Sequence, residues 1–297
     1  MKKFEGIFTV MLTVYDHNGG VDRHAMDHVT HSLIAGGVQG LIVLGSNGEC
    51  PYLIRELQEE AIEAVVKASD DAVPVIVGIN ERGTEEALAM ARYAEDAGAD
   101  GLLVALPVFY PLAEPQVTAH YESISGAVSI PVLYYNFPTH TRLSLSPAAI
   151  AELAARGLIV GAKETIFDAG EVRDLVEATG DDFCAFTGTC LNLTDMMGVG
   201  ACGAICPLPN FAPEKAVALY RALVAGDEET AALLQSEIFT LGPLLASSPT
   251  PHAMLKEALR KLGHPVSTAV KPPLSPLAPG QAELVEQTLR NAGLIEG

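Results

Sequence analysis

Basic side chains are scarce in this sequence. Of its 297 residues, 18 are Lys or Arg and 37 are Asp or Glu, so the formal net charge is −19. Proteins that bind nucleic acid or dock on an anionic membrane need clustered positive charge, and this balance argues against both functions. Hydrophobic residues make up 49% and charged residues only 19%, a composition that excludes wholesale disorder and can fill a large core.

Long apolar runs are also missing. No stretch approaches the roughly 20 consecutive apolar residues that a membrane-spanning helix needs. Residues 1–5 lack the apolar segment of a signal peptide. We therefore expect a soluble, cytoplasmic protein with no membrane and no nucleic-acid partner.

Signatures of metal sites and disulfides are absent too. The five cysteines are an odd number without a CxxC pair, and no histidine pair forms an HExxH motif. Cys202 and Cys206 lie in an apolar stretch and are predicted to be buried free thiols. His24, His28 and His31 share helical spacing, and we interpret them as a partly exposed helix face. The sequence therefore predicts neither a metal site nor a disulfide framework.

What the sequence does contain is a repeated strand–helix pattern. Eight short apolar or β-branched runs recur, at residues 6–10, 40–44, 73–79, 99–105, 130–135, 158–163, 183–187 and 202–206. Most are continuously apolar, which is typical of parallel strands covered on both faces. Amphipathic segments lie between them, such as residues 55–69, 84–98 and 146–156.

Eight such units predict an α/β fold, a (β/α)8 TIM barrel, over residues 1–225. A doubly wound open sheet is the alternative, but it would usually show a GxGxxG loop after the first strand, and none is present. No strand pattern follows Gly226, and residues 228–246, 250–262 and 280–292 read as helices. Residues 226–297 are therefore predicted to form a C-terminal helical region, an appendage rather than a second catalytic domain.

In such barrels the active site lies at the carboxyl ends of the strands. Lys163 ends an apolar strand there, whereas the other seven of the eight lysines fall on termini, helices or loops where we expect easy solvation. Because burial disfavours the charged ammonium, Lys163 is a candidate Schiff-base nucleophile. The equally weighted alternative is a strand-end lysine that pairs with Glu164 or Asp168.

Two neighbouring strand ends add further candidates. Tyr135 could bring its phenol to Lys163 and relay protons, although a rim aromatic is the simpler interpretation. Tyr134 alternates to the other face and should pack outside the barrel. Residues 45–49, Gly-Ser-Asn-Gly-Glu, offer a hydroxyl, an amide and close-approaching backbone N–H groups for a carboxylate. The alternative for this loop is an ordinary tight turn.

Taken together, these segments resemble the dihydrodipicolinate synthase / N-acetylneuraminate lyase family of class I aldolases. The resemblance spans essentially the whole chain and rests on Gly-Ser-Asn-Gly-Glu at 45–49, Tyr-Asn-Phe-Pro at 135–138, Gly-Ala-Lys-Glu at 161–164, Gly-Ala-Ile-Cys at 203–206 and Lys-Pro-Pro-Leu at 271–274. It implies a homotetramer, a dimer of dimers. It also implies that no metal or organic cofactor is needed, because the protonated imine is itself the electron sink.

The resemblance also implies roles for individual residues. Lys163 would form the Schiff base with pyruvate or another 2-oxo acid, and Tyr135 would be the proton relay. Ser46 and Asn47 match positions that bind the keto-acid carboxylate and assist proton transfer, with Gly48 in the same loop. Gly188 and Ile205 match positions that line the keto-acid pocket.

Three positions depart from the family pattern. His140 stands where the lysine-biosynthesis members usually carry an arginine that holds the carboxylate of aspartate semialdehyde, and histidine lacks the bidentate fork. Arg142 lies two residues further on. Phe109 occupies the position of a tyrosine that crosses the dimer interface, although Tyr110 could replace it after a one-residue shift. Asn47 replaces the usual threonine, which resembles the 4-hydroxy-2-oxoglutarate aldolase branch.

We therefore predict a lyase that cleaves a 4-hydroxy-2-oxo acid reversibly to pyruvate and an aldehyde. The alternatives are a synthase that condenses pyruvate with aspartate semialdehyde, a keto-sugar-acid dehydratase and a non-catalytic keto-acid-binding barrel. In a chain of charge −19, local amides and hydroxyls of the Ser46 loop must hold the substrate carboxylate. The sequence does not predict the aldehyde, and its candidate contacts are His140, Arg142, Asn192 and Phe211.

Overall fold

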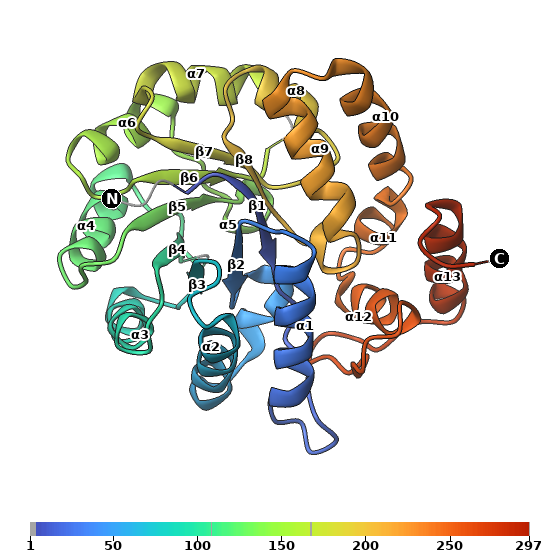
Figure 1. Cartoon of the computed structure of the whole chain (residues 1–297). Helices are drawn as coiled ribbons and strands as arrows, with labels where there is room; N and C mark the ends of the chain where they lie inside the picture. The colour runs from blue at the N-terminus through green and yellow to red at the C-terminus, as the bar shows by residue number, and fades with distance from the viewer. Residues whose placement is uncertain (1–3, 108, 167, 297) are drawn as a thin grey trace.

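The chain folds into a closed barrel of eight parallel strands that follow one another in chain order (Figure 1). The computed structural model describes residues 4–107, 109–166 and 168–296. The strands are β1 (Gly6–Val10), β2 (Gly40–Val43), β3 (Val75–Ile79), β4 (Gly101–Ala105), β5 (Val132–Asn136), β6 (Gly161–Glu164), β7 (Cys184–Thr187) and β8 (Gly203–Cys206). Pairing of Phe8 with Ile205 between β1 and β8 closes the barrel. The predicted TIM barrel is confirmed.

Each predicted strand region overlaps one strand, although several strands begin later than predicted, and β5 and β6 each end one residue later. β3 begins at Val75 and β5 at Val132, in both cases directly after a proline. Pro74 and Pro131 have no backbone N–H to donate to a neighbouring strand, so they delay the start of pairing. The apolar residues before them belong to the preceding loops.

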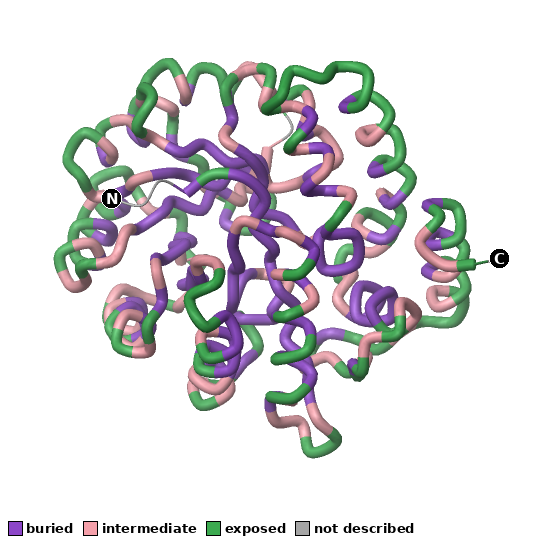
Figure 2. Tube along the Cα trace, viewed as in Figure 1, coloured by how far each residue is buried: buried purple, intermediate pink, exposed green. Residues whose placement is uncertain are grey.

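The strands are apolar throughout because they separate two cores. The inner core fills the barrel and includes Phe8, Tyr135, Phe186 and Ile205. Phe8 packs edge-on against Phe186 with 5.5 Å between ring centroids. Gly40 leaves room for the Phe8 ring, since a Cβ at that position would lie 2.1 Å from it. Figure 2 shows the buried strands surrounded by helices with exposed outer faces.

The outer core lies between the strands and the surrounding helices. Tyr134 belongs to this core and Tyr135 to the inner one, which confirms the predicted alternation along β5. The helices of the barrel are α1 (Arg23–Ala35), α2 (Arg55–Ser69), α3 (Thr84–Asp96), α4 (Glu114–Ser125), α5 (Pro138–Thr141), α6 (Pro147–Ala155), α7 (Ala169–Thr179), α8 (Leu193–Gly198) and α9 (Pro213–Ala225).

Four helices follow the barrel and lie on one side of it, beside α9 and α1 in Figure 1. They are α10 (Glu228–Phe239), α11 (Gly242–Ala246), α12 (His252–Lys261) and α13 (Gln281–Asn291). The single helix predicted over residues 228–246 is wrong, because a new helix begins at Gly242 with Pro243 in its first turn. In the described part of the chain, no helix is both long and apolar enough to cross a membrane.

Candidate active site

A cavity of about 290 Å³ opens at the carboxyl ends of the strands, where active sites of this fold lie. The ends of five strands and the segment around α11 and α12 line it. The lining residues are Ser46, Asn47, Tyr135, Phe137, His140, Lys163, Thr165, Gly188, Thr189, Leu191, Pro207, Leu245, Ala246, Ser248, Pro249, Pro251 and His252.

Lys163 and Tyr135 meet at this cavity because β5 and β6 pair them in register. The Lys163 Nζ lies 4.2 Å from the centroid of the Tyr135 ring, and only 3% of Lys163 is exposed. Neither carboxylate considered from the sequence pairs with it. Glu164 accepts a 2.6 Å hydrogen bond from Asn136 Nδ2, and Asp168 caps α7. Among the described residues, no ion pair involves Lys163.

The buried Glu164 is chemically unusual. It alternates to the outer side of β6, where only one of its oxygens has a hydrogen-bond partner among the described residues. Burial raises the pKa of Glu164 to about 7. The carboxyl group next in sequence to Lys163 therefore ionises less readily than an ordinary glutamate.

Ser46 reaches the same centre from the turn that follows β2. Its Oγ lies 3.4 Å from the Tyr135 hydroxyl. Phe137 stacks on Tyr135 and His140 stacks on Phe137, with ring centroids 5.7 and 3.8 Å apart. In this arrangement the amine can add to a carbonyl carbon of a substrate. The phenol and the hydroxyl can then carry a proton away from the reacting centre.

The turn that carries Ser46 and Asn47 is a short 3-10 helix, η1 (Ser46–Gly48). Gly48 lies buried beneath the cavity rather than in its lining. A Cβ on Gly48 would lie 3.3 Å from the Met11 carbonyl oxygen, and the Gly48 carbonyl accepts a 2.8 Å hydrogen bond from Thr13 Oγ1. The glycine thus lets the turn pack closely on the segment after β1.

Gly188 and Ile205 occupy different levels of the site. Gly188 lines the cavity, and a Cβ there would lie 2.7 Å from Thr165 Oγ1. Ile205 is fully buried in the inner core together with Tyr135, so it lies under the cavity and does not line it.

Of the four residues that the sequence suggested as contacts of the aldehyde, one lines the cavity and three do not. His140 lines the rim, and partial burial lowers its pKa. Arg142 is exposed at the end of α5 and does not line the cavity. Asn192 accepts a 3.2 Å hydrogen bond from Thr187 Oγ1, and Phe211 packs in the outer core.

Sequence reasoning missed the contribution of the C-terminal helical region. Leu245, Ser248 and His252 line the cavity although they follow the barrel. The His252 Nε2 lies 3.1 Å from the Ser46 carbonyl oxygen. A carbonyl only accepts hydrogen bonds, so this nitrogen carries the proton. Burial lowers the pKa of His252, which favours the neutral ring. The Pro-Thr-Pro break before α12 was the available sequence signal.

The prediction that seven lysines are easily solvated is wrong for Lys256. Its side chain is fully buried, and its Nζ lies 2.5 Å from Oε1 of the equally buried Glu49. Burial lowers the pKa of Lys256 to about 8. The helical pattern of α12 could not reveal this pair, because the partner lies 207 residues away in sequence.

Other clusters in the described part of the chain offer no competing site. His24, His28 and His31 are exposed on α1, and no group of three or more His, Cys, Asp or Glu residues there could hold a metal ion. The five cysteines are free thiols, of which Cys206 is buried and Cys202 partly buried.

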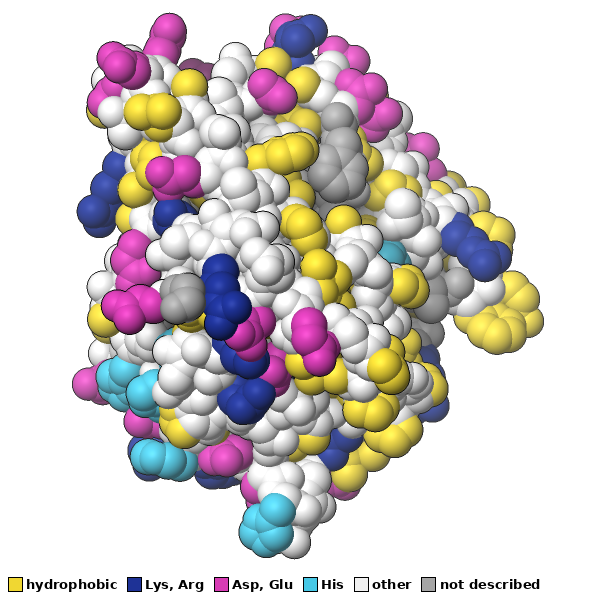
Figure 3. All heavy atoms as spheres, turned by 90° about the vertical axis from the view of Figure 1, so that its right-hand side faces the viewer, with side chains coloured by type: hydrophobic (Ala, Val, Ile, Leu, Met, Phe, Trp, Pro, Cys, Tyr) yellow, Lys and Arg dark blue, Asp and Glu magenta, His cyan; other side chains and the backbone are white. Residues whose placement is uncertain are grey.

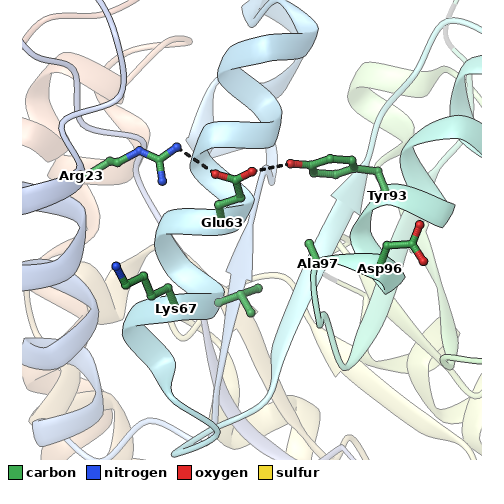
Figure 4. A pocket seen from close by; sticks show the side chains of 7 residues that line it. Arg23, Glu63, Lys67, Tyr93, Asp96 and Ala97 are labelled. Atoms are coloured by element: carbon green, nitrogen blue, oxygen red, sulfur yellow. Dashed lines mark hydrogen bonds and ion pairs between the residues drawn. The ribbon is translucent and has the colours of Figure 1, made fainter.

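A second cavity, of about 530 Å³, lies outside the barrel between α1, α2 and α3 (Figure 4). Three of its polar side chains, those of Arg23, Glu63 and Tyr93, are linked to one another. Arg23 forms a 2.9 Å ion pair with Glu63, which also accepts a 2.8 Å hydrogen bond from Tyr93. These hydrogen bonds lower the pKa of Glu63. This cavity lies away from the strand ends where Lys163 and Tyr135 meet.

Comparisons with known proteins agree with this site. The model of the dihydrodipicolinate synthetase family matches residues 3–292. The chain is 33% identical to a probable 2-dehydro-3-deoxy-D-pentonate aldolase, YjhH, of Escherichia coli K12, covering 99% of both chains. It is 31% identical to a 4-hydroxy-tetrahydrodipicolinate synthase of Bartonella quintana, covering 98% of this chain and 99% of the relative.

A solved structure resembles the whole chain closely. The crystal structure of YagE, a prophage protein of the dihydrodipicolinic acid synthase family from E. coli K12, in complex with pyruvate, superposes with a TM-score of 0.95. The two chains are 30% identical, and the match covers 99% of this chain and 100% of YagE.

Proposed function

This chain belongs to the dihydrodipicolinate synthetase family, and from that membership we propose the reaction of its cavity: the reversible cleavage of a 4-hydroxy-2-oxo acid to pyruvate and a hydroxylated, uncharged aldehyde. It is an enzyme of the class I aldolase type. The observation that carries the proposal is the buried Lys163 amine, which contacts Tyr135 and forms no ion pair among the described residues.

The proposed reaction uses the Lys163 amine as its nucleophile. The amine attacks C2 of the oxo acid, and loss of water gives a protonated imine. The C3–C4 bond then breaks, and its electron pair moves into the imine to form an enamine. Tyr135 takes the proton of the C4 hydroxyl and passes it on through Ser46. Protonation of the enamine at C3 and hydrolysis release pyruvate and regenerate the amine.

We assign the pyruvate half of the cavity to the turn and the barrel floor. Ser46 and Asn47 hold the carboxylate, and Gly48 lets their turn pack closely. Gly188 keeps space beside Lys163, and Ile205 supports Tyr135 from below. No metal and no organic cofactor takes part in this scheme, since the protonated imine accepts the electron pair.

The aldehyde half of the cavity favours a neutral, hydroxylated substrate. Thr165, Thr189 and Ser248 contribute hydroxyls to the lining, and Thr165 Oγ1 has no hydrogen-bond partner within the described residues. His140 and His252 add two imidazoles. The names of two relatives, "Probable 2-dehydro-3-deoxy-D-pentonate aldolase YjhH" and "Putative 2-dehydro-3-deoxy-D-gluconate aldolase YagE", support a sugar-acid substrate.

A second candidate function is the condensation of pyruvate with aspartate semialdehyde. Several relatives about as similar as YjhH bear the name of that synthase. Against it stands the position of Arg142, which is exposed, and among the described residues that line the cavity there is no arginine. A keto-sugar-acid dehydratase would use the same imine but would expel a hydroxyl group from the substrate.

Trapping with borohydride tests the chemistry directly. Incubation with pyruvate and borohydride should attach a reduced pyruvate adduct to Lys163, detected by peptide mass spectrometry, and Lys163→Arg should abolish it. A folded wild-type enzyme without the adduct would refute the Schiff base. Pyruvate release from a panel of 2-dehydro-3-deoxy pentonate and hexonate substrates, compared with condensation on aspartate semialdehyde, separates the two candidate functions.

We also propose a cytoplasmic homotetramer, a dimer of dimers, in which residues 1–225 form the catalytic barrel and residues 226–297 the helical region. Phe109 and Tyr110 are 84% and 72% exposed and pack edge-on against each other, and contiguous exposed apolar surface of this kind is typical of interfaces. The face formed by the C-terminal helices also displays apolar side chains (Figure 3). Sedimentation of the wild type and of F109A/Y110A tests the assembly.

A further inference from the structure

The C-terminal helical region binds the turn that carries Ser46 and Asn47 through hydrogen bonds and a buried ion pair. We propose that Glu49, Lys256 and His252 are positioning residues for the aldol reaction, because they hold η1 where the Ser46 hydroxyl reaches Tyr135. This inference rests on the proposed function. It goes beyond that function by giving residues 226–297 a part in positioning the Ser46 hydroxyl.

The first contact is a buried ion pair at the end of the turn. Glu49 and Lys256 side chains are both 0% exposed, and their charged atoms lie 2.5 Å apart. Lys256 Nζ also donates to the Ala269 carbonyl at 2.6 Å and lies 4.2 Å from the centroid of the Tyr15 ring. The ammonium therefore has partners on three sides, which is what a buried charge requires.

The second oxygen of Glu49 is also held by the C-terminal region. Glu49 Oε2 accepts a 2.6 Å hydrogen bond from the backbone N–H of Lys271. The Lys271 side chain bonds to the Gly19 carbonyl and lies 4.5 Å from the centroid of the Tyr15 ring. The groups that face Lys256 are thus Glu49 from the turn, Tyr15 from the segment after β1, and Lys271 and His252 from the C-terminal region. Both carboxylate oxygens of Glu49 are fixed by residues outside the barrel.

The backbone explains why the turn needs such support. Leu44 and Glu49, which flank the turn, have φ angles of 58° and 63°, in the left-handed region that side chains with a Cβ rarely adopt. Such conformations are costly and persist only where the surroundings determine them. The fixed carboxylate of Glu49 supplies that constraint on one side of Ser46. Without it, the backbone is free to relax and to move the Ser46 hydroxyl.

The third contact holds the turn at its other end. The neutral His252 ring donates from Nε2 to the Ser46 carbonyl oxygen over 3.1 Å. Lys256 lies one helical turn further along α12, so the same helix makes the contact with Ser46 and the ion pair with Glu49. The residue whose carbonyl His252 holds is the one whose Oγ lies 3.4 Å from the Tyr135 hydroxyl.

Three variants of the full-length enzyme test the inference. Lys256→Met removes the cation from Glu49. The double variant E49Q/K256M removes both charges and retains an acceptor for the Lys271 N–H. Lys261→Met is the matched control, since Lys261 lies on the same helix and pairs with Glu286 away from the turn.

We expect Lys256→Met to lower kcat at least tenfold, with little change in the pyruvate concentration needed for borohydride trapping. The double variant should recover most of the stability in urea unfolding while its kcat stays at least fivefold below that of the wild type. Lys261→Met should keep the wild-type kcat.

A purely structural role makes the opposite prediction, because kcat would then recover together with stability. The inference is overturned if the folded Lys256→Met or the double variant has a kcat within twofold of the wild type. If Lys256→Met fails to fold, the double variant alone decides. Trapping of wild-type Lys163 by pyruvate is recorded in parallel, so failure of the Schiff base itself is distinguished from failure of the positioning role.

Discussion

Gly188 is the position at which the smallest possible substitution should disturb the pyruvate half of the cavity. In Gly188→Ala the new Cβ would lie 2.7 Å from Thr165 Oγ1, 2.9 Å from its Cγ2 and 3.0 Å from its Cα. Carbon atoms pack best at about 3.5–4.0 Å, so Thr165 has to move. Its backbone N–H is bonded to the Asn136 carbonyl at 3.0 Å, and rotation of the side chain alone cannot relieve the contact with Cα.

The magnitude follows from the cost of overpacking. Inserting a methyl group where neighbours cannot withdraw costs about 1–3 kcal/mol. Part of that cost should appear as lost stability and part as Thr165 displaced toward the cavity. We expect pyruvate to bind roughly tenfold more weakly, since a tenfold change corresponds to about 1.4 kcal/mol.

The assay is borohydride trapping of Lys163 at increasing pyruvate concentrations, combined with urea unfolding of each variant. Gly198→Ala is the control, because Gly198 ends α8 and nothing lies within 4 Å of the position that its new methyl group would take. Adding Thr165→Ala to Gly188→Ala removes the two contacts below 3.0 Å and should recover part of the binding. If Gly188→Ala binds pyruvate and unfolds like the wild type, the close approach of Gly188 to Thr165 does not constrain the site.

Three further predictions concern stability. Lys256→Met should destabilise the fold by about 3–5 kcal/mol in urea unfolding, because Glu49 is left buried without its cation. E49Q/K256M should lose much less stability, and equal losses in the single and double variants would contradict the pairing argument. Burial raises the pKa of Glu164 from 4.5 to about 7, so as pH rises the unfolded chain loses this proton at a lower pH than the folded chain does. The free energy of unfolding should therefore fall as pH rises from about 4.5 to 7. Glu164→Gln should flatten that part of the profile, and an unchanged slope would be evidence against it. Ser146 caps α6 by accepting from the Ala149 N–H, so Ser146→Ala should cost about 1 kcal/mol in the same assay.

The sequence predicted the barrel because the strand signal is local. Continuous apolar runs bounded by turns identify strands buried on both faces, and the rule for strand ends then selects Lys163, Tyr135 and Ser46. The structure brings these three together around one cavity. Register makes this possible, since pairing of β5 with β6 sets Tyr135 beside Lys163.

The residues that sequence reasoning missed depend on contacts between distant segments. His252 and Lys256 lie on a helix whose sequence pattern gives no sign of its partners, Ser46 and Glu49, about two hundred residues earlier. Arg142 shows that closeness in sequence to a cavity residue does not place a side chain at the cavity. It lies near His140 in the chain, yet it is exposed at the end of α5 while His140 lines the rim.

Lys163 and Lys256 show what distinguishes a reactive lysine from a structural one in this protein. Both are almost completely buried, so burial alone cannot separate them. Lys256 directs its protons to Glu49 and to the Ala269 carbonyl, and an ammonium held in this way has no lone pair for a carbonyl carbon. Lys163 contacts the face of an aromatic ring and, among the described residues, no carboxylate. In a chain with 37 acidic residues, the lack of an ion pair at Lys163 among the described residues is the feature that distinguishes it from the buried Lys256.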